Sequence, residues 1–234
     1  MATDHDDAAG IMVWPWPQTT QRWIMATPEN ERLTELLCSR LCHDLISPLS
    51  AITNGIELVS EGDKATFDDA IGLIGASARQ GTSRLAYFRL ALGAGGTESG
   101  TAFGIVRKAI DEYFEDRKLR IAWIDPVPQQ DAPFERQMRK LLLNLMLVAG
   151  ECAQRDASIS AEVVPEKPQI KISITGGRSK LRDDVRTGFD PKLGVDAMTV
   201  RNVIAWNSRK LAEGLGLHLT VVEDGQTSVE LSVN

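Results

Sequence analysis

Two long stretches near the start of this chain have the apolar spacing of amphipathic helices. In the first, apolar residues recur every three or four positions, which places them on one stripe of a helix: Leu33, Leu37, Leu41, Leu45, Pro48, Ile52, Ile56 and Val59. In the second, apolar or small residues alternate in steps of four and three, the heptad period of helical bundles: Phe67, Ile71, Ile74, Ala78, Gly81, Leu85, Phe88 and Leu92. Residues 27–96 are therefore expected to form an antiparallel helical hairpin.

The ends of both predicted helices have recognisable signals. Thr27 provides a hydroxyl cap directly before a proline, and acidic side chains follow in the first turn. The first helix is expected to run to about Ser60 and to kink at Pro48, which removes a backbone donor. A turn at residues 61–63 leads into the second helix, which is expected to stop at the glycine-rich residues 93–96.

The first helix has more apolar surface than a single neighbouring helix can cover. Four side chains flank its main stripe and add to that surface: Cys38, Cys42, Leu49 and Leu58. Pairing two hairpins into a four-helix bundle covers the surface, so a homodimer is expected. The two cysteines stand one helical turn apart beside His43, where metal binding is possible but core packing is the commoner role.

The pattern changes to mixed α/β after residue 96. Runs rich in β-branched and apolar residues predict strands over 119–124, 158–163, 169–175, 217–222 and 227–233. Helices are expected over 101–118, 133–154 and about 196–215. The whole chain is therefore predicted to be α+β, with a dimeric four-helix bundle followed by an α/β sandwich over residues 97–234. In that sandwich the helices are expected to cover one face of the sheet.

Residues 1–26 differ from the rest of the chain. They begin with an acidic run and continue with Trp14-Pro15-Trp16-Pro17. Terminal segments order only when they are tied down, so a mobile N-terminal extension is expected. Docking of Trp14, Trp16 and Trp23 on the body of the protein is the alternative.

Composition limits the classes of function. The net charge of −6 argues against general binding to nucleic acid, whose phosphates require a basic surface. No apolar run reaches the roughly 18 residues that a membrane span needs. Three cysteines, an odd number, give no disulfide framework and favour a reducing compartment, and the acidic start is unlike a signal peptide. A cytoplasmic protein that contacts neither membrane nor nucleic acid is therefore expected.

His43 is the histidine best placed for chemistry. At about 100° per residue it falls nearly opposite the apolar stripe of its helix. Its own face has Leu36 as the only large apolar member and otherwise consists of polar side chains: Ser39, Arg40, Ser47, Ser50, Asn54 and Glu57. An imidazole on a solvated helix face, followed by the acidic Asp44, can act as an accessible nucleophile. The other histidines, His5 in an acidic tail and His218 in a predicted strand, have no such setting.

The residues around His43 resemble the phosphoacceptor motif of sensor histidine kinases, in which a histidine is followed by an acid and then by a proline and a leucine. That order is matched by His43, Asp44, Pro48 and Leu49. A closer resemblance is to the ChpT-type histidine phosphotransferases of alphaproteobacterial cell-cycle phosphorelays, and it lies in residues 37–48 and 51–58. It extends over about residues 33–234, in the second half by the order of elements alone.

Two departures separate the chain from ATP-dependent kinases. The kinase helix that meets nucleotide has two asparagines, and the second holds magnesium; here Asn144 keeps the first, and Val148 stands at the second. The next kinase loop begins with an aspartate that binds adenine, where this chain has Gly176. Val148 and Gly176 lack the oxygens that a metal and an adenine require. The second half is therefore expected to be a degenerate ATPase-like domain, with no nucleotide, metal or other cofactor in this chain.

The resemblance implies a phosphotransferase that takes a phosphoryl group from a receiver-domain aspartate and holds it as phosphohistidine on His43. The group then passes to the aspartate of another receiver. Asp44 would orient the imidazole or take its ring proton, and the magnesium ion would belong to the partner receiver domain. The implied partners are the receiver of a hybrid histidine kinase and the receivers of response regulators, including a DNA-binding cell-cycle regulator and a proteolysis-linked receiver.

Helical spacing adds four candidates for binding the phosphoryl group or the partner. Arg40 and Ser47 lie one turn to either side of His43 and can reach phosphoryl oxygens. Asn54 and Glu57 would lie on the docking face.

Some alternatives stay open at this point. Arg40 has a simpler interpretation as a surface charge paired to Glu35 or Asp44, because such pairs are common and weak. Asp44 has one as a solvated helix acid. An ATP-dependent histidine kinase and a non-enzymatic dimeric scaffold that only binds response regulators are the alternative functions.

Overall fold

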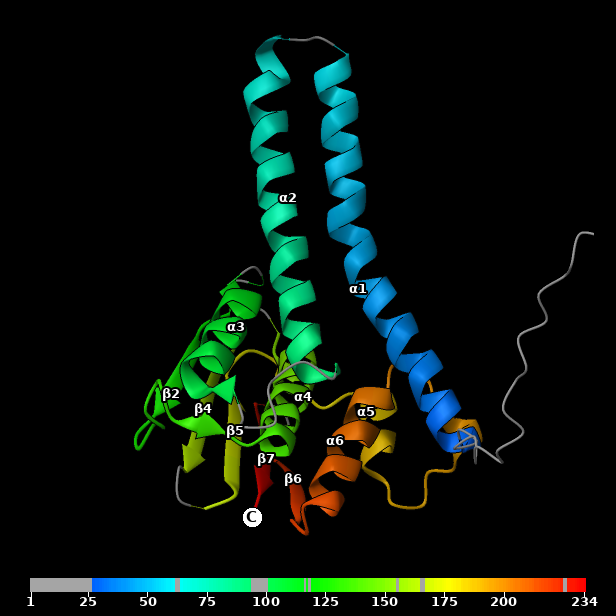
Figure 1. Cartoon of the computed structure of the whole chain (residues 1–234), viewed down its shortest axis with the longest axis vertical. Coiled ribbons are helices and arrows are strands. Elements are labelled where there is room, and N and C mark those ends of the chain that lie inside the picture. Colours follow the sequence, from blue (N-terminus) through cyan, green and yellow to red (C-terminus); the bar gives the residue numbers. More distant parts are fainter. Residues whose placement is uncertain are drawn as a thin grey trace, which may run out of the picture.

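A long helical hairpin projects from a mixed α/β domain in the computed structural model (Figure 1). The structure describes residues 27–61, 64–93, 101–115, 117, 119–154, 156–164, 167–224 and 227–234. The hairpin consists of α1 (Pro28–Ser60) and α2 (Lys64–Ala91). The predicted extension over residues 1–26 and most of the predicted linker at residues 93–96 lie outside the described residues.

The α/β domain contains three longer helices and a five-stranded sheet. The helices are α3 (Phe103–Glu115), α4 (Arg136–Cys152) and α6 (Val203–Gly214). The strands of the sheet are β2 (Ile121–Ile124), β4 (Ser158–Val164), β5 (Gln169–Thr175), β6 (Leu219–Glu223) and β7 (Ser228–Val233). Shorter elements are β1 (Thr101–Ala102), β3 (Pro133–Phe134), α5 (Asp183–Arg186) and the 3₁₀ turns η1 (Thr187–Phe189) and η2 (Val195–Ala197).

The start of α1 follows the predicted signals. Thr27 is extended, with φ of −60° and ψ of 147°, and its hydroxyl accepts a hydrogen bond from the Asn30 N–H at 3.3 Å. The helix continues through Pro48 to Ser60, as predicted. Close approach of α2 depends on Gly55, because a Cβ atom there would lie only 2.6 Å from Ile74 Cγ1.

The single apolar stripe predicted for α1 is wrong in detail. Of its members only Pro48 is buried, and Ile56 is exposed. Leu36, predicted to lie on the polar face, is buried in the main core. The reason is that α1 contacts α6 and η2 of the α/β domain as well as α2, so a second face of the helix is covered.

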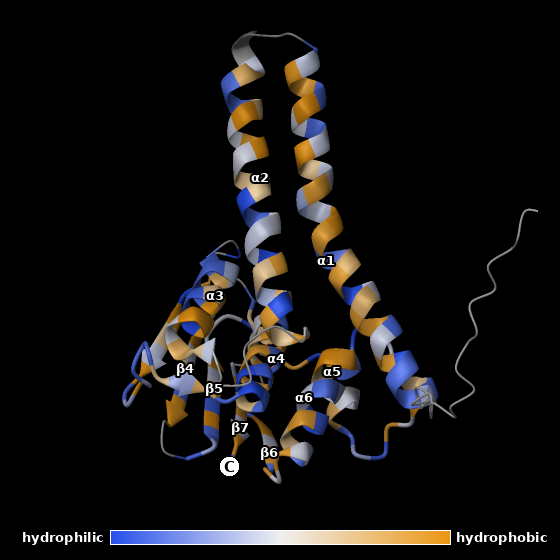
Figure 2. Ribbon diagram, in the orientation of Figure 1, coloured by the Kyte–Doolittle hydropathy of each residue, from blue (hydrophilic) through white to orange (hydrophobic). Residues whose placement is uncertain are grey.

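Hydrophobic positions recur along both helices of the hairpin (Figure 2). Several large apolar side chains at such positions are exposed: Ile46, Leu49, Ile56 and Leu58 on α1, and Phe67, Ile71, Leu73 and Leu85 on α2. The predicted heptad of α2 is therefore divided. Phe88 is buried and Gly81 faces Pro48, whereas Phe67, Ile71 and Leu85 are exposed to solvent. None of the helices in the described part combines the length and the apolar character that crossing a membrane needs.

The sheet has the strand order β2-β4-β5-β7-β6. Strand β2 runs parallel to β4, with α4 in the connection between them, and the other neighbours are antiparallel. Alternate residues of β5 are buried against the helix layer, where α4 contacts β5 and β7. Helices α3, α4 and α6 lie on the same face of the sheet (Figure 1). This confirms the predicted β4–β5 hairpin and the helix layer on one face.

The predicted starts of three helices are wrong. The helix expected from residue 101 begins instead at Phe103, because residues 101–102 form β1. Residues 133–134 form β3 and pair with β1, and the ring of Phe134 packs edge to face on Phe103 at 5.4 Å. Helix α6 begins at Val203 rather than near residue 196. Before it, the Asn202 side chain accepts from the Thr199 N–H at 2.7 Å and donates to the Ala197 carbonyl at 3.2 Å. These bonds satisfy the backbone in a loop, which competes with a helix there.

Candidate functional site

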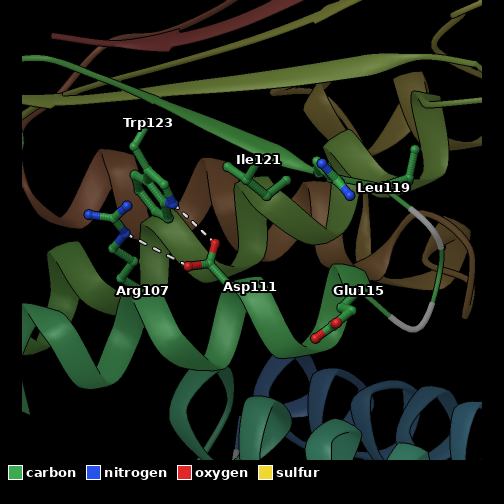
Figure 3. Close-up of a pocket in the computed structure, with 7 residues that line it drawn as sticks. Arg107, Asp111, Glu115, Leu119, Ile121 and Trp123 are labelled. Atoms are coloured by element: carbon green, nitrogen blue, oxygen red, sulfur yellow. Dashed lines mark hydrogen bonds and ion pairs between the residues drawn. The ribbon is translucent and has the colours of Figure 1, made fainter.

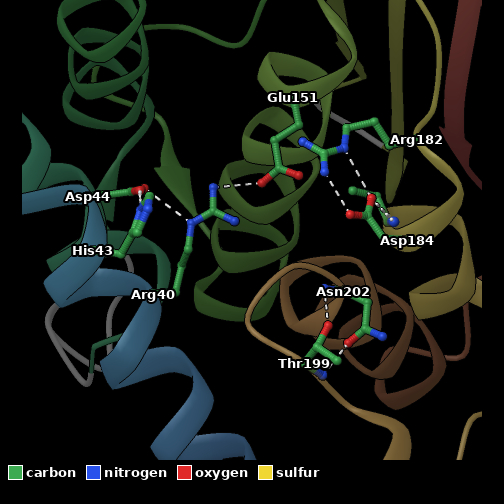
Figure 4. A network of polar contacts seen from close by, with 9 residues as sticks. Arg40, His43, Asp44, Glu151, Arg182, Asp184, Thr199 and Asn202 are labelled. Carbon is green, nitrogen blue, oxygen red and sulfur yellow. Dashed lines mark hydrogen bonds and ion pairs between the residues drawn. The ribbon is translucent and has the colours of Figure 1, made fainter.

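His43 projects from α1 into solvent. Its side chain is 79% exposed, and its ring nitrogen Nδ1 lies 3.1 Å from Asp44 Oδ1 (Figure 4). Since a carboxylate only accepts, this contact is a hydrogen bond when Nδ1 has the proton, and Nε2 is then the nitrogen with a free lone pair. Among the described residues no group bonds to Nε2. The ring is thus held at one nitrogen and accessible at the other.

Asp44 is not the solvated helix acid that the sequence left open. Its side chain is only 10% exposed, because one step along the helix turns it about 100° away from His43 and toward the interior. Its second oxygen, Oδ2, lies 3.3 Å from Arg40 Nε. Both oxygens of the carboxylate are therefore engaged, one by His43 and the other by Arg40.

Arg40 lies between two carboxylates. Its Nη2 is 2.6 Å from Glu151 Oε1 on α4, and its side chain is only 12% exposed. Burial disfavours the charged guanidinium, but the negative charges of Glu151 and Asp44 outweigh it and raise the pKa of Arg40. The prediction that Arg40 lies on an exposed face is wrong, since α4 covers it. Its predicted pairing with Asp44 is present, whereas Glu35 pairs with Arg32 at 3.3 Å.

Glu151 was not among the residues predicted from the sequence. It is the one acidic residue in α4, an otherwise mostly buried helix. An acid in a mostly buried helix requires a nearby cation. The position of Glu151 in the sequence could therefore have indicated a buried ion pair.

A cavity of about 500 Å³ adjoins His43 between α1 and the α/β domain. It is lined by residues from both parts of the chain: Ser39, Arg40, His43, Glu151, Arg182, Val200 and Arg201. Asp184 binds Arg182 through both oxygens, at 3.1 and 2.7 Å, and lies 3.2 Å from Arg201 Nη1 (Figure 4). The hydrogen bond from Arg182 lowers the pKa of Asp184. The cavity beside the exposed imidazole is thus lined by three arginines and Glu151, and Asp184 pairs with two of those arginines.

The remaining predicted residues lie elsewhere on α1. Ser47, Asn54 and Glu57 are exposed and do not line this cavity. The structure therefore brings together Arg40, His43 and Asp44, while Ser47, Asn54 and Glu57 continue the exposed face of the hairpin.

The residues that would meet nucleotide in a kinase have other contacts here. Val148 and Asn144 are both fully buried. Asn144 Nδ2 donates to the carbonyls of Ala91 at 3.1 Å and Lys140 at 2.8 Å, and its Oδ1 accepts from Asn207 Nδ2 at 3.1 Å. Gly176 directly follows β5 and has a positive φ of 85°. The amide of Asn144 is therefore used to join α2, α4 and α6.

A second cavity, of about 650 Å³, lies between α3 and β2 (Figure 3). Of the two carboxylates that line it, Asp111 accepts from Trp123 Nε1 at 3.0 Å and lies 3.7 Å from Arg107 Nε. The Arg107 guanidinium also lies 5.5 Å from the centre of the Trp123 ring. Arg107, Asp111 and Trp123 thus satisfy one another, and none of the predicted site residues lies there.

The cysteines do not form a metal site in the described part of the chain, where no three potential ligands come together. Cys38 and Cys42 are exposed, while Cys152 at the end of α4 is buried. Cys38 lines an apolar hollow of about 480 Å³ with Leu37, Leu41, Leu85 and Phe88.

Comparison with known proteins gives three related similarities. Residues 103–227, more than half of the chain, match the family described as histidine phosphotransferase C-terminal domain. The chain is 32% identical over 196 residues to the protein phosphotransferase ChpT of Brucella abortus (strain 2308), covering 81% of this chain and 89% of that protein. A solved bacterial phosphotransferase superposes with a TM-score of 0.72 at 28% identity, over 86% of this chain and 95% of that one.

Proposed function

The chain belongs to the histidine phosphotransferase family, and we propose that His43 is the residue that receives and donates the phosphoryl group. The membership confirms the family predicted from the residues around His43, and the protein is a phosphotransferase of a phosphorelay. The choice of His43 rests mainly on one observation: an imidazole that is 79% exposed is held at Nδ1 by a carboxylate that is 10% exposed. A rigid helix thus presents Nε2 to a partner.

In the proposed transfer, the lone pair of Nε2 attacks the phosphorus of an aspartyl phosphate on a receiver domain. A P–N bond forms, the P–O bond to the receiver's carboxylate breaks, and that carboxylate leaves with the electron pair. Asp44 keeps the hydrogen bond from Nδ1–H, so it balances the positive charge that develops on the ring. Transfer to the next receiver reverses these steps. The receiver's magnesium ion neutralises the phosphoryl oxygens.

The proposed partners are receiver domains, the donor on a hybrid histidine kinase and the acceptors on response regulators. The exposed continuation of the His43 face, with Ser47, Asn54 and Glu57, supports docking there. Ile46, 61% exposed beside His43, adds an apolar contact to that face. A cell-cycle role and a cytoplasmic location stay predictions.

A second copy of this chain is proposed to cover the remaining apolar surface of the hairpin. Leu49, Ile56, Phe67, Ile71 and Leu85 are exposed, and the apolar hollow beside Leu85 opens on the hairpin surface. Exposed apolar patches of this extent are uncommon on monomers. A four-helix bundle made from two hairpins would cover them while leaving the His43 face to receivers.

The α/β domain is proposed to bind no nucleotide. Val148 offers no oxygen for magnesium and is packed in the core, and the Asn144 amide is already bonded within the fold. Rather than binding nucleotide, this domain contacts α1 through Glu151, which pairs with Arg40.

Incubation with a phosphorylated receiver tests the assignment of His43. The wild-type chain should acquire phosphate that is labile in acid, and His43→Ala should acquire none. His218→Ala is the matched control, because His218 is also exposed but lies at the start of the last β-hairpin. Equal labelling of His43→Ala and wild type would contradict the proposal.

Two further outcomes of this assay separate the alternative functions. Phosphate that appears on His43 from ATP alone would show that the protein is an ATP-dependent histidine kinase. Stable receiver binding without transfer would make it a scaffold.

A further inference from the structure

A line of charged contacts joins α4 of the α/β domain to the imidazole of His43. Glu151 Oε1 lies 2.6 Å from Arg40 Nη2, and Arg40 Nε lies 3.3 Å from Asp44 Oδ2. Asp44 Oδ1 in turn lies 3.1 Å from His43 Nδ1 (Figure 4). The first three side chains are 10–16% exposed, whereas His43 is 79% exposed. Only the last member of this line is open to a partner.

We propose that Glu151 is a positioning residue for phosphoryl transfer, acting through Arg40 to reserve one oxygen of Asp44 for the Nδ1–H of His43. The inference rests on the proposed role of His43 as the phosphoryl acceptor. It gives α4 a direct effect on the reactive ring, in addition to its packing in the core.

The need for Glu151 follows from the geometry of the guanidinium group. An arginine close to a carboxylate tends to bind both of its oxygens with two parallel N–H groups. Here Arg40 contacts only Oδ2 of Asp44, because Nη2 is directed to Glu151. Without the Glu151 carboxylate, Nη2 can turn to Oδ1 of Asp44 and compete with the His43 ring for it.

Loss of that oxygen would change the chemistry of the ring. A neutral imidazole has its proton on either nitrogen, and the hydrogen bond at the other position decides which. With Oδ1 free, the proton stays on Nδ1 and Nε2 attacks. With Oδ1 taken by Arg40, both tautomers are populated, the ring is free to rotate, and Nδ1 competes as the nucleophile.

Shielding makes the arrangement sensitive to a single change. Ion pairs on the surface are screened by solvent and salt. The pair of Arg40 and Glu151 instead joins α1 to α4 and has little exposure. The substitution Glu151→Gln keeps the size of the side chain and removes its charge. It is milder than truncating Arg40, which would leave two carboxylates without their cation.

The test compares Glu151→Gln with wild type in the full-length chain. Nitrogen-15 NMR of the His43 ring should show the Nδ1–H tautomer predominating in wild type and a mixture in the variant. Phosphoryl transfer from a phosphorylated receiver should slow by about tenfold or more, the size of effect that outer partners of a reactive group have. Phosphorus NMR should show Nε2-phosphohistidine in wild type and an added Nδ1 isomer in the variant. The receiver's Kd should stay within twofold.

Two comparisons make the test specific. Glu230→Gln removes an exposed ion pair with Lys171 in the sheet, and it should leave ring signals and transfer rate unchanged. Arg40→Gln should slow transfer as Glu151→Gln does, and the double variant should be no slower than Arg40→Gln alone, because Glu151 acts through Arg40.

Three results would overturn the proposal. The first is a Glu151→Gln variant with wild-type ring signals and transfer rate. The second is a double variant whose rate loss is the product of the losses of Arg40→Gln and Glu151→Gln, and the third is a Glu151→Gln variant with a lowered Tm but unchanged ring signals. The tautomer measurement needs no phosphoryl group. Its outcome is therefore distinct from a failure of His43→Ala to lose phosphate, which would instead remove the proposed function.

Discussion

The Arg84 side chain on α2 donates a hydrogen bond from Nη1 to the backbone carbonyl of Asp44 on α1, at 2.5 Å. That carbonyl cannot receive the usual helical bond from four residues later, because Pro48 has no N–H. Arg84 therefore supplies the donor that the proline lacks, at the residue next to His43. The change of direction in α1, visible in Figure 1, is in this way tied to the second helix.

Replacing Arg84 by methionine should destabilise the hairpin. The substitution removes the donor and leaves the carbonyl of a mostly buried residue unsatisfied, which costs about 1–3 kcal/mol of unfolding free energy. Urea unfolding followed by circular dichroism measures this loss. Arg79→Met, at an exposed position of the same helix, should change stability by less than about 0.5 kcal/mol. Equal losses for the two variants would show that the bond to Asp44 contributes nothing.

Local signals were sufficient for part of the fold. The cap at Thr27, the continuation of α1 through Pro48 and the β4–β5 hairpin depend on residues close together in the chain, and these predictions are confirmed. The start of α6 was placed too early because the Asn202 side chain satisfies the loop before it, and helical spacing does not register such a competitor.

In the candidate site too, features set by local sequence were predicted and features set by distant contacts were not. The exposure of His43 followed from spacing along one helix, whereas the burial of the adjacent Asp44 did not. The burial of Arg40 did not, because the face of a helix is covered or open according to which distant segment packs there, and Glu151 lies far along the chain. A sequence predicts which side chains share a face, but the occupant of that face is decided by tertiary packing.

The proposed homodimer can be tested with acidic substitutions on α2. Leu85 is 53% exposed, so Leu85→Glu should leave the fold intact and prevent pairing of the hairpins. Phe88 is 2% exposed, so Phe88→Glu should instead unfold the domain junction by burying a charge. Light scattering at micromolar concentration should give about twice the 25.6 kDa chain mass for wild type and one chain mass for Leu85→Glu.

Leu73→Glu controls for the general effect of an added charge. Leu73 is also exposed, but helical rotation places it on another side of α2 from Ile71 and Leu85. This variant should remain dimeric. A monomeric wild type, or equal dissociation of the Leu73 and Leu85 variants, would contradict the proposed bundle.

Stability should fall at alkaline pH in part through Cys152. Burial, with the nearby charge of Glu151, raises the pKa of the Cys152 thiol from 9.0 to about 12. Above pH 9 the unfolded chain loses this proton while the folded chain keeps it, so stability decreases as the pH rises toward 12. At pH 10.5 the contribution is a loss of about 2 kcal/mol, from 1.36 kcal/mol for each unit of pH.

Urea unfolding at pH 8 and pH 10.5 measures this decrease. Cys152→Ala should show a smaller decrease than wild type, although it is less stable at both values because of the lost packing. Cys38→Ala, at an exposed position, should retain the wild-type dependence on pH. An identical pH dependence in wild type and Cys152→Ala would show that the thiol does not titrate between the two values.

Asn144 should be a structural residue rather than part of a nucleotide site. Its buried amide donates to carbonyls of α2 and α4 and accepts from Asn207 on α6, so three helices meet at one side chain. Asn144→Asp removes both donated bonds and buries a charge, which should cost about 3–5 kcal/mol of stability. Asn207→Ala removes one bond only and should cost about 1 kcal/mol.

Thermal unfolding with millimolar ATP and magnesium completes this test. A ligand that binds only the folded chain raises Tm in proportion to ln(1 + [L]/Kd), so 1 mM nucleotide would stabilise by about 2.7 kcal/mol if Kd were 10 μM. The wild-type Tm should not change, because Val148 gives magnesium no ligand and the Asn144 amide is already bonded within the fold. A rise in Tm that is lost in Asn144→Asp would instead assign this asparagine to nucleotide.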